Sequence, residues 1–255
     1  MSSYGLWLST AGMKVNEHRQ TLLANNMANA STTGFKHDLA VVTERRVQSK
    51  ESPDGFSFAH PVLDGMAGGV NVHPTFYSSE QGSIETTGRP LDVAIRGEGF
   101  FQVSDGVDRR YTRNGEFAMN TKGELILADA SGNWNVLDDA GAPIVFDPTG
   151  ERPVVSQDGT VRQGKEVVAR IGLVVGEDPR ALRKVGQNLF ELIRGEMSPA
   201  GGTLIGGARE ASTFDPVQGL ASMIEVSRAY QLNASMIQLQ DQLNGLAAST
   251  IGRLA

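Results

Sequence analysis

The sequence contains no cysteine among its 255 residues. Disulfides, thiolate metal sites and cysteine nucleophiles are therefore excluded. Long hydrophobic runs are absent too, because no apolar stretch approaches the roughly 20 residues that a helix needs to span a bilayer. The opening residues MSSYGLWLSTAGMKVNEH lack the basic start, the apolar run and the cleavage site of a secretory signal peptide. We expect no membrane insertion, and we expect any export to leave this N-terminus uncleaved.

Clustered positive charge is missing as well. The 23 Lys and Arg residues are scattered along a chain whose net charge is -6 and whose pI is near 5.3. A nucleic-acid footprint or a polybasic membrane patch needs basic residues concentrated on one surface. We therefore expect no nucleic-acid partner.

Sequence signatures of catalysis and cofactor binding are also lacking. There is no GxSxG or Walker A run, and Gly97-Glu98-Gly99 lacks the third glycine and the following helix of a phosphate loop. The histidines show neither HxH nor HExxH spacing: His18, His37, His60 and His73. We expect no enzyme, no cofactor and no metal site. The rival enzyme hypothesis is a glycosidase that uses a pair of carboxylates on a β domain.

The two ends of the chain have the apolar spacing of helices. In the N-terminal helix one stripe comprises Leu8, Ala11, Val15, His18 and Leu22, and a second comprises Leu6, Met13, Leu23 and Met27. The C-terminal helix is predicted to begin with Asp215 as N-cap and Pro216 as its first residue. Further along, Leu232, Met236, Leu239, Leu243 and Leu246 alternate spacings of four and three, as in a coiled-coil seam.

The region between the helices is predicted to be mainly β structure. Alternating apolar and polar runs are separated by turn pairs such as Asp105-Gly106, Asn114-Gly115 and Lys122-Gly123, which favour tight hairpins. Residues 36–81 are instead dense in Pro and Gly, as in a long loop. The predicted fold is α+β, with a mainly antiparallel β central domain at 82–212 and an extended linker or arm at 36–81. Residues 1–35 and 213–255 are predicted to form long helices that pair as a coiled-coil stalk.

The terminal segments are poor in charge. Only eight of the 77 residues in 1–34 and 213–255 are charged, half the proportion of 20% in the whole chain. A solvated helix usually carries more ion pairs on its exposed face, whereas neutral polar and small side chains suit close packing on several sides. Periodicity alone also allows a two-helix hairpin packed on the β domain of a monomer.

Three runs resemble signatures of the bacterial flagellar rod and hook proteins. The first is LANNMANASTTGFK at 23–36, the second is GRPLDVAIRGEGFF at 88–101 with YTRNGEF at 111–117, and the third is MIEVSRAYQLN at 223–233. They occur in the family order and cover the chain. Within the family, the second run is most similar to proximal-rod members, with distal-rod members as runner-up.

The resemblance implies a structural subunit that polymerises through its terminal helices into the axial shaft that transmits torque from motor to hook. The implied partners are further copies, proximal and distal rod proteins, the P and L rings and the type III export apparatus, and the implied location is the periplasmic rod of the basal body. The alternatives are a distal-rod or hook-type protein, or a stalked β module for adhesion or a phage-like tail. The expected assembly interface comprises Leu8, Val15, Leu22, Asn25, Asn26, Asn29, Ile224, Arg228, Tyr230, Leu232, Met236, Leu239, Leu243 and Leu246.

Overall fold

The computed structural model describes residues 2–44, 69–73, 75–128, 134–178 and 181–251. The chain divides into two compact units. The helical unit contains residues 1–28, 38–76 and 216–255, and the β unit contains residues 29–37 and 77–215.

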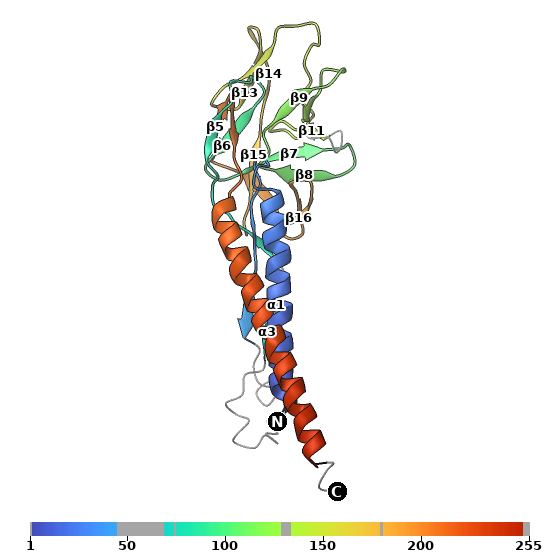
Figure 1. The fold of residues 1–255 in the computed structure, drawn as a ribbon. Coiled ribbons are helices and arrows are strands. Elements are labelled where there is room, and N and C mark those ends of the chain that lie inside the picture. The colour runs from blue at the N-terminus through green and yellow to red at the C-terminus, as the bar shows by residue number, and fades with distance from the viewer. Residues whose placement is uncertain (1, 45–68, 74, 129–133, 179–180, 252–255) are drawn as a thin grey trace. The chain divides into compact units, whose positions relative to one another are not determined.

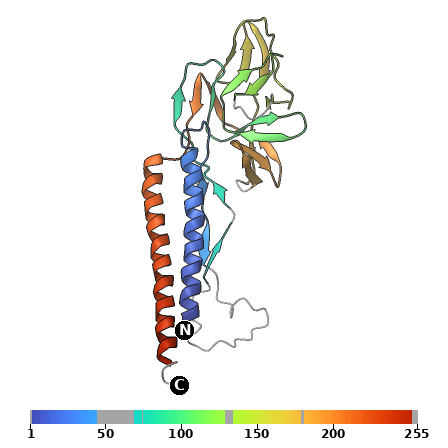
Figure 2. The same ribbon diagram turned by 45° about the vertical axis from the view of Figure 1, so that its right-hand side comes forward.

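The helical unit is built on α1 (Ser2–Ala28) and α3 (Pro216–Ile251), which lie side by side in both ribbon views (Figures 1 and 2). The predicted start of the second helix at Pro216 is confirmed. A small hairpin, β2 (Val42–Glu44) with β3 (Val70–Val72), belongs to the same unit, and β3 contacts α1. Two further short strands are β1 (Asp38–Leu39) and β4 (Phe76–Tyr77). The middle of the predicted arm, 45–68, lies outside the described residues.

Trp7 of α1 packs closely over Gly69, the residue before β3. Gly69 has a positive φ of 94°, and a Cβ there would overlap the indole ring of Trp7. Glycine therefore satisfies both the backbone conformation and the close approach of the ring. This contact places the start of β3 beside the first turns of α1.

The predicted coiled-coil stalk is wrong, although the α+β class and the mainly antiparallel β domain fit the structure. The large residues of the predicted seam, from Leu232 to Leu246, are exposed instead of facing α1. The helices meet elsewhere: Gln240 occupies the space beside Gly5, and Asn233 occupies the space beside Gly12. A knobs-into-holes seam needs apolar knobs. Here the contact places amide side chains against glycines, so the periodic leucines are not its seam.

The β unit is antiparallel in every strand pairing described within it. Its largest sheet has nine strands, with the path β16-β17-β8-β7-β11-β10-β9, while β15 pairs with β7 and β18. These strands are β7 (Phe100–Ser104), β8 (Arg109–Thr112), β9 (Phe117–Met119), β10 (Leu125–Leu127), β11 (Asn135–Val136), β15 (Leu173–Gly176), β16 (Leu182–Gly186), β17 (Leu189–Leu192) and β18 (Met197–Pro199). A three-stranded sheet contains β12 (Pro153–Val155), β13 (Thr160–Gln163) and β14 (Glu166–Arg170). Two pairs complete the unit: β5 (Ile84–Thr86) with β20 (Ala208–Glu210), and β6 (Val93–Arg96) with β19 (Thr203–Gly206).

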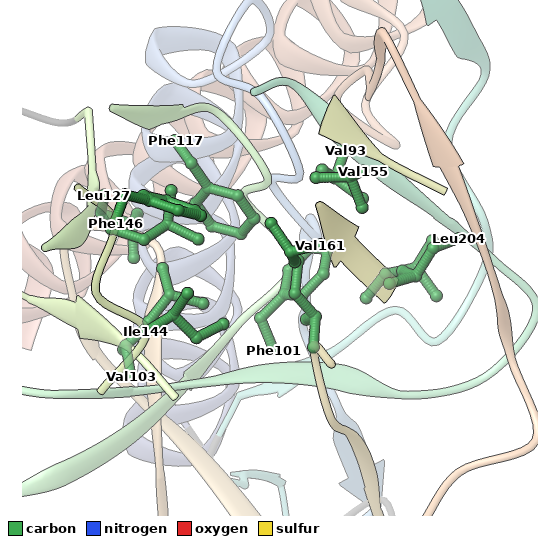
Figure 3. Packing of buried hydrophobic residues seen from close by; sticks show 14 of the residues in the cluster. Val93, Phe101, Val103, Phe117, Leu127, Ile144, Phe146, Val155, Val161 and Leu204 are labelled. Carbon is green, nitrogen blue, oxygen red and sulfur yellow. The ribbon is translucent and has the colours of Figure 1, made fainter. Parts of the chain in front are cut away.

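The main core of the β unit gathers side chains from several sheets (Figure 3). Phe101 of β7 is fully buried and meets Phe117 of β9 edge-on, with ring centroids 5.0 Å apart. Val161 of β13 and Leu204 of β19 join the same cluster. Burial of these side chains is the main source of stability for the unit.

Two of the predicted turns are confirmed and one is not. Asp105-Gly106 joins β7 to β8, and Lys122-Gly123 joins β9 to β10, each glycine having a positive φ. Asn114-Gly115, however, joins β8 to β9, which do not pair with each other. A Cβ on Gly115 would collide with the carbonyl oxygen of Val93, and Gly115 O accepts a hydrogen bond from Val93 N. This glycine therefore permits a close approach of backbone rather than a hairpin turn.

Candidate assembly surface

Helix α3 carries a row of apolar side chains that are exposed among the described residues. We call it the outer row; its members are 48–77% exposed and comprise Val217, Leu220, Ile224, Leu232, Met236, Leu239, Leu243 and Leu246. Single exposed apolar residues are ordinary on protein surfaces, but eight large ones along most of one helix are typical of an interaction site. The outer row is therefore the candidate assembly surface.

The orientation of α3 follows from its contact with α1. Asn233 and Gln240 face α1, and each is preceded by a member of the outer row, Leu232 and Leu239. Successive residues of an α-helix point about 100° apart. The amides thus lie on the side of α3 that faces α1, while the leucines are turned away from it.

In α1, the predicted stripe is partly covered. Val15 is buried, while Leu8 and Leu22 are half-buried. Tyr230 of α3 is also half-buried. These four residues belong to the packed parts of the helical unit more than to its open surface.

The asparagines near the end of α1 have local partners. Asn26 is almost fully buried: its Nδ2 donates to Asp38 O at 2.9 Å, and its Oδ1 accepts from Asp38 N at 2.8 Å. Asn25 Nδ2 donates to Asp38 Oδ2 at 3.3 Å. In the β unit, Asn29 Oδ1 accepts from Thr32 Oγ1 at 3.2 Å. These contacts fix the turn and the extended segment that follow α1.

The β unit contains a buried charged cluster that joins the segment after α1 to the segment before α3. Glu210 of β20 is completely buried; its Oε1 accepts from Lys36 Nζ at 2.7 Å and from Gly82 N at 2.9 Å, and its Oε2 accepts from Arg113 Nη1 at 3.2 Å. Burial lowers the pKa of Lys36 and that of Arg113 below their ordinary values, and the nearby carboxylate of Glu210 opposes both shifts. The cluster contains two cationic side chains and one carboxylate.

Backbone hydrogen bonds tie the same two segments together. Gly34 N donates to Glu210 O at 2.7 Å, Thr213 N donates to Phe35 O at 3.0 Å, and His37 N donates to Thr213 Oγ1 at 2.9 Å. The segment after α1 and the segment before α3 are therefore held side by side within the β unit.

A cavity of about 240 Å³ adjoins this cluster. Its lining includes Lys36, Arg113, Tyr77 and Phe100, and the guanidinium carbon of Arg113 lies 5.5 Å from the centroid of the Phe100 ring. Burial raises the pKa of Tyr77 to about 12. Within the described residues no group of three or more His, Cys, Asp or Glu side chains could hold a metal ion. Neither described helix has the length and apolar character needed to cross a bilayer.

Comparison with known proteins identifies the family. The flagellar hook protein FlgE/F/G D1 domain matches residues 94–163, and the flagellar basal body rod FlgEFG protein C-terminal domain matches residues 205–250. The flagellar basal-body rod protein FlgF of Caulobacter vibrioides is 38% identical over 236 residues, with 91% of each chain covered. The chain belongs to the flagellar basal-body rod proteins. The FlgG rod protein of Bacillus subtilis is 30% identical over 261 residues, covering 93% of this chain and 95% of that relative.

The resemblance to the rod and hook proteins is therefore confirmed, and with it the expectation of a structural subunit of the basal-body rod. The names of these relatives are those of structural proteins rather than enzymes. In this rod protein the second match begins in β19 and includes almost all of α3, so it contains the entire outer row. The candidate assembly surface thus lies in a region that the family model describes.

The sequence showed the three runs that resemble the family signatures, but it did not predict the cluster around Glu210. Lys36 and Arg113 were parts of two of the quoted runs, yet Glu210 lay outside all three. One signal could have predicted it. Lys36 and Arg113 are basic residues that need an acidic partner where they are buried, and Glu210 is an acidic residue within the predicted β region. The outer row, by contrast, contains six of the predicted interface residues: Ile224, Leu232, Met236, Leu239, Leu243 and Leu246. Of the two remaining predicted residues of α3, Arg228 is exposed and Tyr230 is half-buried.

Proposed function

We propose that this chain polymerises in the flagellar rod through the outer row of α3, and that the polymer is part of the axial shaft that carries torque from the motor to the hook. The observation that supports the proposal is the exposure of eight large apolar side chains along a helix that carries only three charged residues. An exposed apolar surface of this kind marks an interaction site.

The size of the effect is adequate for assembly. Full burial of a Leu, Ile or Met side chain contributes about 1.5–3 kcal/mol, so half-exposed members of the row would add on the order of 1 kcal/mol each. Association itself costs an estimated 4–15 kcal/mol in lost translational and rotational freedom. Eight residues are enough to offset much of that loss, and the rest would come from additional contacts. Identical subunits joined head to tail by a rotation that does not close form an open helical filament.

The finer assignments are also proposals. We assign the chain to the proximal rod because its identity to the FlgF of Caulobacter vibrioides, 38%, exceeds its identity to the FlgG of Bacillus subtilis, 30%. Its partners would be further copies, neighbouring proximal and distal rod proteins and the surrounding P and L rings. Its location would be the periplasmic part of the basal body, reached through the flagellar type III export apparatus. Absence of cysteine suits a chain that is exported unfolded. We infer no catalytic role.

Cysteine cross-linking tests the assembly surface directly, because the chain has no native cysteine to interfere. Leu239→Cys, in a strain that lacks the native gene, should give cross-linked species in purified basal bodies after treatment with a short thiol-reactive cross-linker. Val107→Cys is the matched control, since Val107 is 92% exposed in the turn between β7 and β8. Equal cross-linking of the two variants, or none with Leu239→Cys, would contradict the proposal.

Complementation separates the proximal-rod assignment from its alternative. The gene that encodes this chain should restore motility and normal basal-body morphology to a bacterial strain whose gene for the proximal-rod protein FlgF has been deleted. Restoration of a strain that lacks FlgG instead would assign the chain to the distal rod.

A further inference from the structure

Two charged residues interrupt the outer row of α3. Glu225 and Arg228 lie three positions apart, between Ile224 and Leu232, and both are exposed. Glu225 precedes Leu232 by seven residues, and Arg228 precedes it by four. Residues four and seven apart share a helix face. One acidic and one basic side chain therefore stand on the same face as the exposed leucines.

Neither charge is neutralised within the part of the chain that the structure describes. Glu225 and Arg228 make no ion pair with any described residue, whereas nearly every charged side chain on β5, β8 and β20 is paired. The only other charged residue of α3 is Asp241. Asp241 follows Leu239 by two residues, about 200° around the helix, so it does not belong to the outer row. Two of the three charges in this helix thus lie where a partner would cover them.

Covering the outer row would remove both charges from water. A buried charge without a partner is strongly unfavourable, and because the structure shows no ion pair between Glu225 and Arg228 themselves, an opposite charge on the covering surface would satisfy each of them. A second copy of the same chain supplies both signs from the same two positions. Opposed charges at an interface also fix its register, because a shift would place like charges together or leave both charges unpaired.

We propose that Glu225 of one copy pairs with Arg228 of a neighbouring copy, and that this pair sets the longitudinal register in which the outer rows pack. The inference rests on the proposed function, since it assumes that the outer row contacts another copy. It adds the residues that determine specificity: the leucines provide apolar area, and the two charges select one alignment among those that the repeating leucines allow. Because the leucines repeat every seven residues, two outer rows can slide past each other by seven residues and still bring leucine against leucine. The charges do not repeat, so the same shift would leave them unpaired.

Charge reversal tests the pair. Glu225→Arg and Arg228→Glu are each expected to lower the amount of the chain in purified basal bodies by about tenfold or more, because each places two like charges in contact. The double reversal, Glu225→Arg with Arg228→Glu, should restore incorporation to within about twofold of the native level, and so should co-expression of the two single-reversal chains, in which opposite charges can meet only between copies. Asp241→Arg is the matched control, with the same kind of change in the same helix, and should incorporate normally.

The variants must be shown to fold before incorporation is compared. All three positions are exposed, so helical circular dichroism and the thermal unfolding of the purified full chain should match the native protein. The same strains carrying Leu239→Cys report separately on whether the outer row contacts another copy. Cross-linking through Leu239→Cys with no loss on single reversal, or with no rescue by the double reversal, would overturn the charge pair and leave the assembly surface in place. If the chain that carries Leu239→Cys alone gives neither cross-linking nor incorporation into basal bodies, the assembly surface itself would be overturned.

Discussion

Glu210→Gln should destabilise the β unit strongly while leaving the volume of the side chain nearly unchanged. The native carboxylate accepts hydrogen bonds from Lys36 Nζ, Gly82 N and Arg113 Nη1 and is completely buried. Glutamine removes the negative charge that, among the described residues, contacts both cations, and its NH₂ group would face a donor. Breaking a buried ion pair by neutralising one partner costs about 3–5 kcal/mol. For a unit of roughly 150 residues, that loss corresponds to a fall in Tm of roughly 6–20 °C.

Tryptophan fluorescence can follow the β unit alone. The chain has two tryptophans, and Trp134 packs against the main core of the β unit. A Trp7→Phe background removes the other, so urea unfolding monitored by Trp134 reports the free energy of unfolding of this unit. Glu85→Gln is the matched control, because its pair with Arg209 is solvent-exposed and such pairs contribute only about 0–1 kcal/mol. If Glu210→Gln lowers the free energy of unfolding no more than Glu85→Gln, the buried cluster does not stabilise the unit as argued.

The pH dependence distinguishes lost charge from lost packing. Burial lowers the pKa of Lys36 below its ordinary 10.5, and Glu210 opposes that shift, so Glu210→Gln should lower the folded-state pKa of Lys36 further. Between the lowered folded value and the ordinary value, the unfolded chain binds more protons than the folded chain, and stability rises with pH. The deficit of Glu210→Gln relative to the native protein should therefore shrink as pH rises from 7 toward 10. A deficit independent of pH in this range would indicate a packing defect instead.

Three further substitutions test the other contacts. Phe101→Ala should lower the free energy of unfolding of the β unit by about 3–5 kcal/mol, measured by Trp134 fluorescence, because it removes a fully buried ring. Gly12→Leu should lower the helical circular dichroism of the full chain, since even a Cβ at Gly12 would lie 2.9 Å from Asn233 Nδ2 and overpacking costs about 1–3 kcal/mol. Leu239→Pro should abolish incorporation into basal bodies, because proline inside a helix costs about 3 kcal/mol or more, yet should leave the urea midpoint of the β unit unchanged.

Local chemistry explains which parts of the fold the sequence could predict. The start of α3 at Pro216 and the turns at Asp105-Gly106 and Lys122-Gly123 depend on neighbouring residues alone. Asn114-Gly115 has the same local signal, but the approach of the Val93 backbone decides its structure. The ion pair between Lys36 and Glu210 joins residues 174 positions apart, a distance over which composition and periodicity carry no information.

Helix periodicity is informative in a similarly limited way. It finds a row of apolar residues on α3, but it cannot say which neighbour covers that row. The prediction of a coiled-coil seam assigned the row to α1, and the structure instead puts Asn233 and Gln240 against Gly12 and Gly5. The candidate interface was therefore predictable as a set of residues, whereas its role required knowledge of which face α1 occupies.

The face of α3 that carries Asn233 also carries the half-buried Val226 and Ile237, so the helix divides its apolar residues between this face and the outer row. In the β unit, Glu210 and the backbone bonds around Phe35 and Thr213 already hold together the segment that follows α1 and the segment that precedes α3. The helices therefore do not need a large apolar seam to keep their connecting segments adjacent. Placing the leucines of α3 in such a seam would stabilise the single chain but would hide the surface with which it can bind another copy. The outer row stays exposed in the single chain, so the stability of the helical unit should increase with assembly more than that of the β unit.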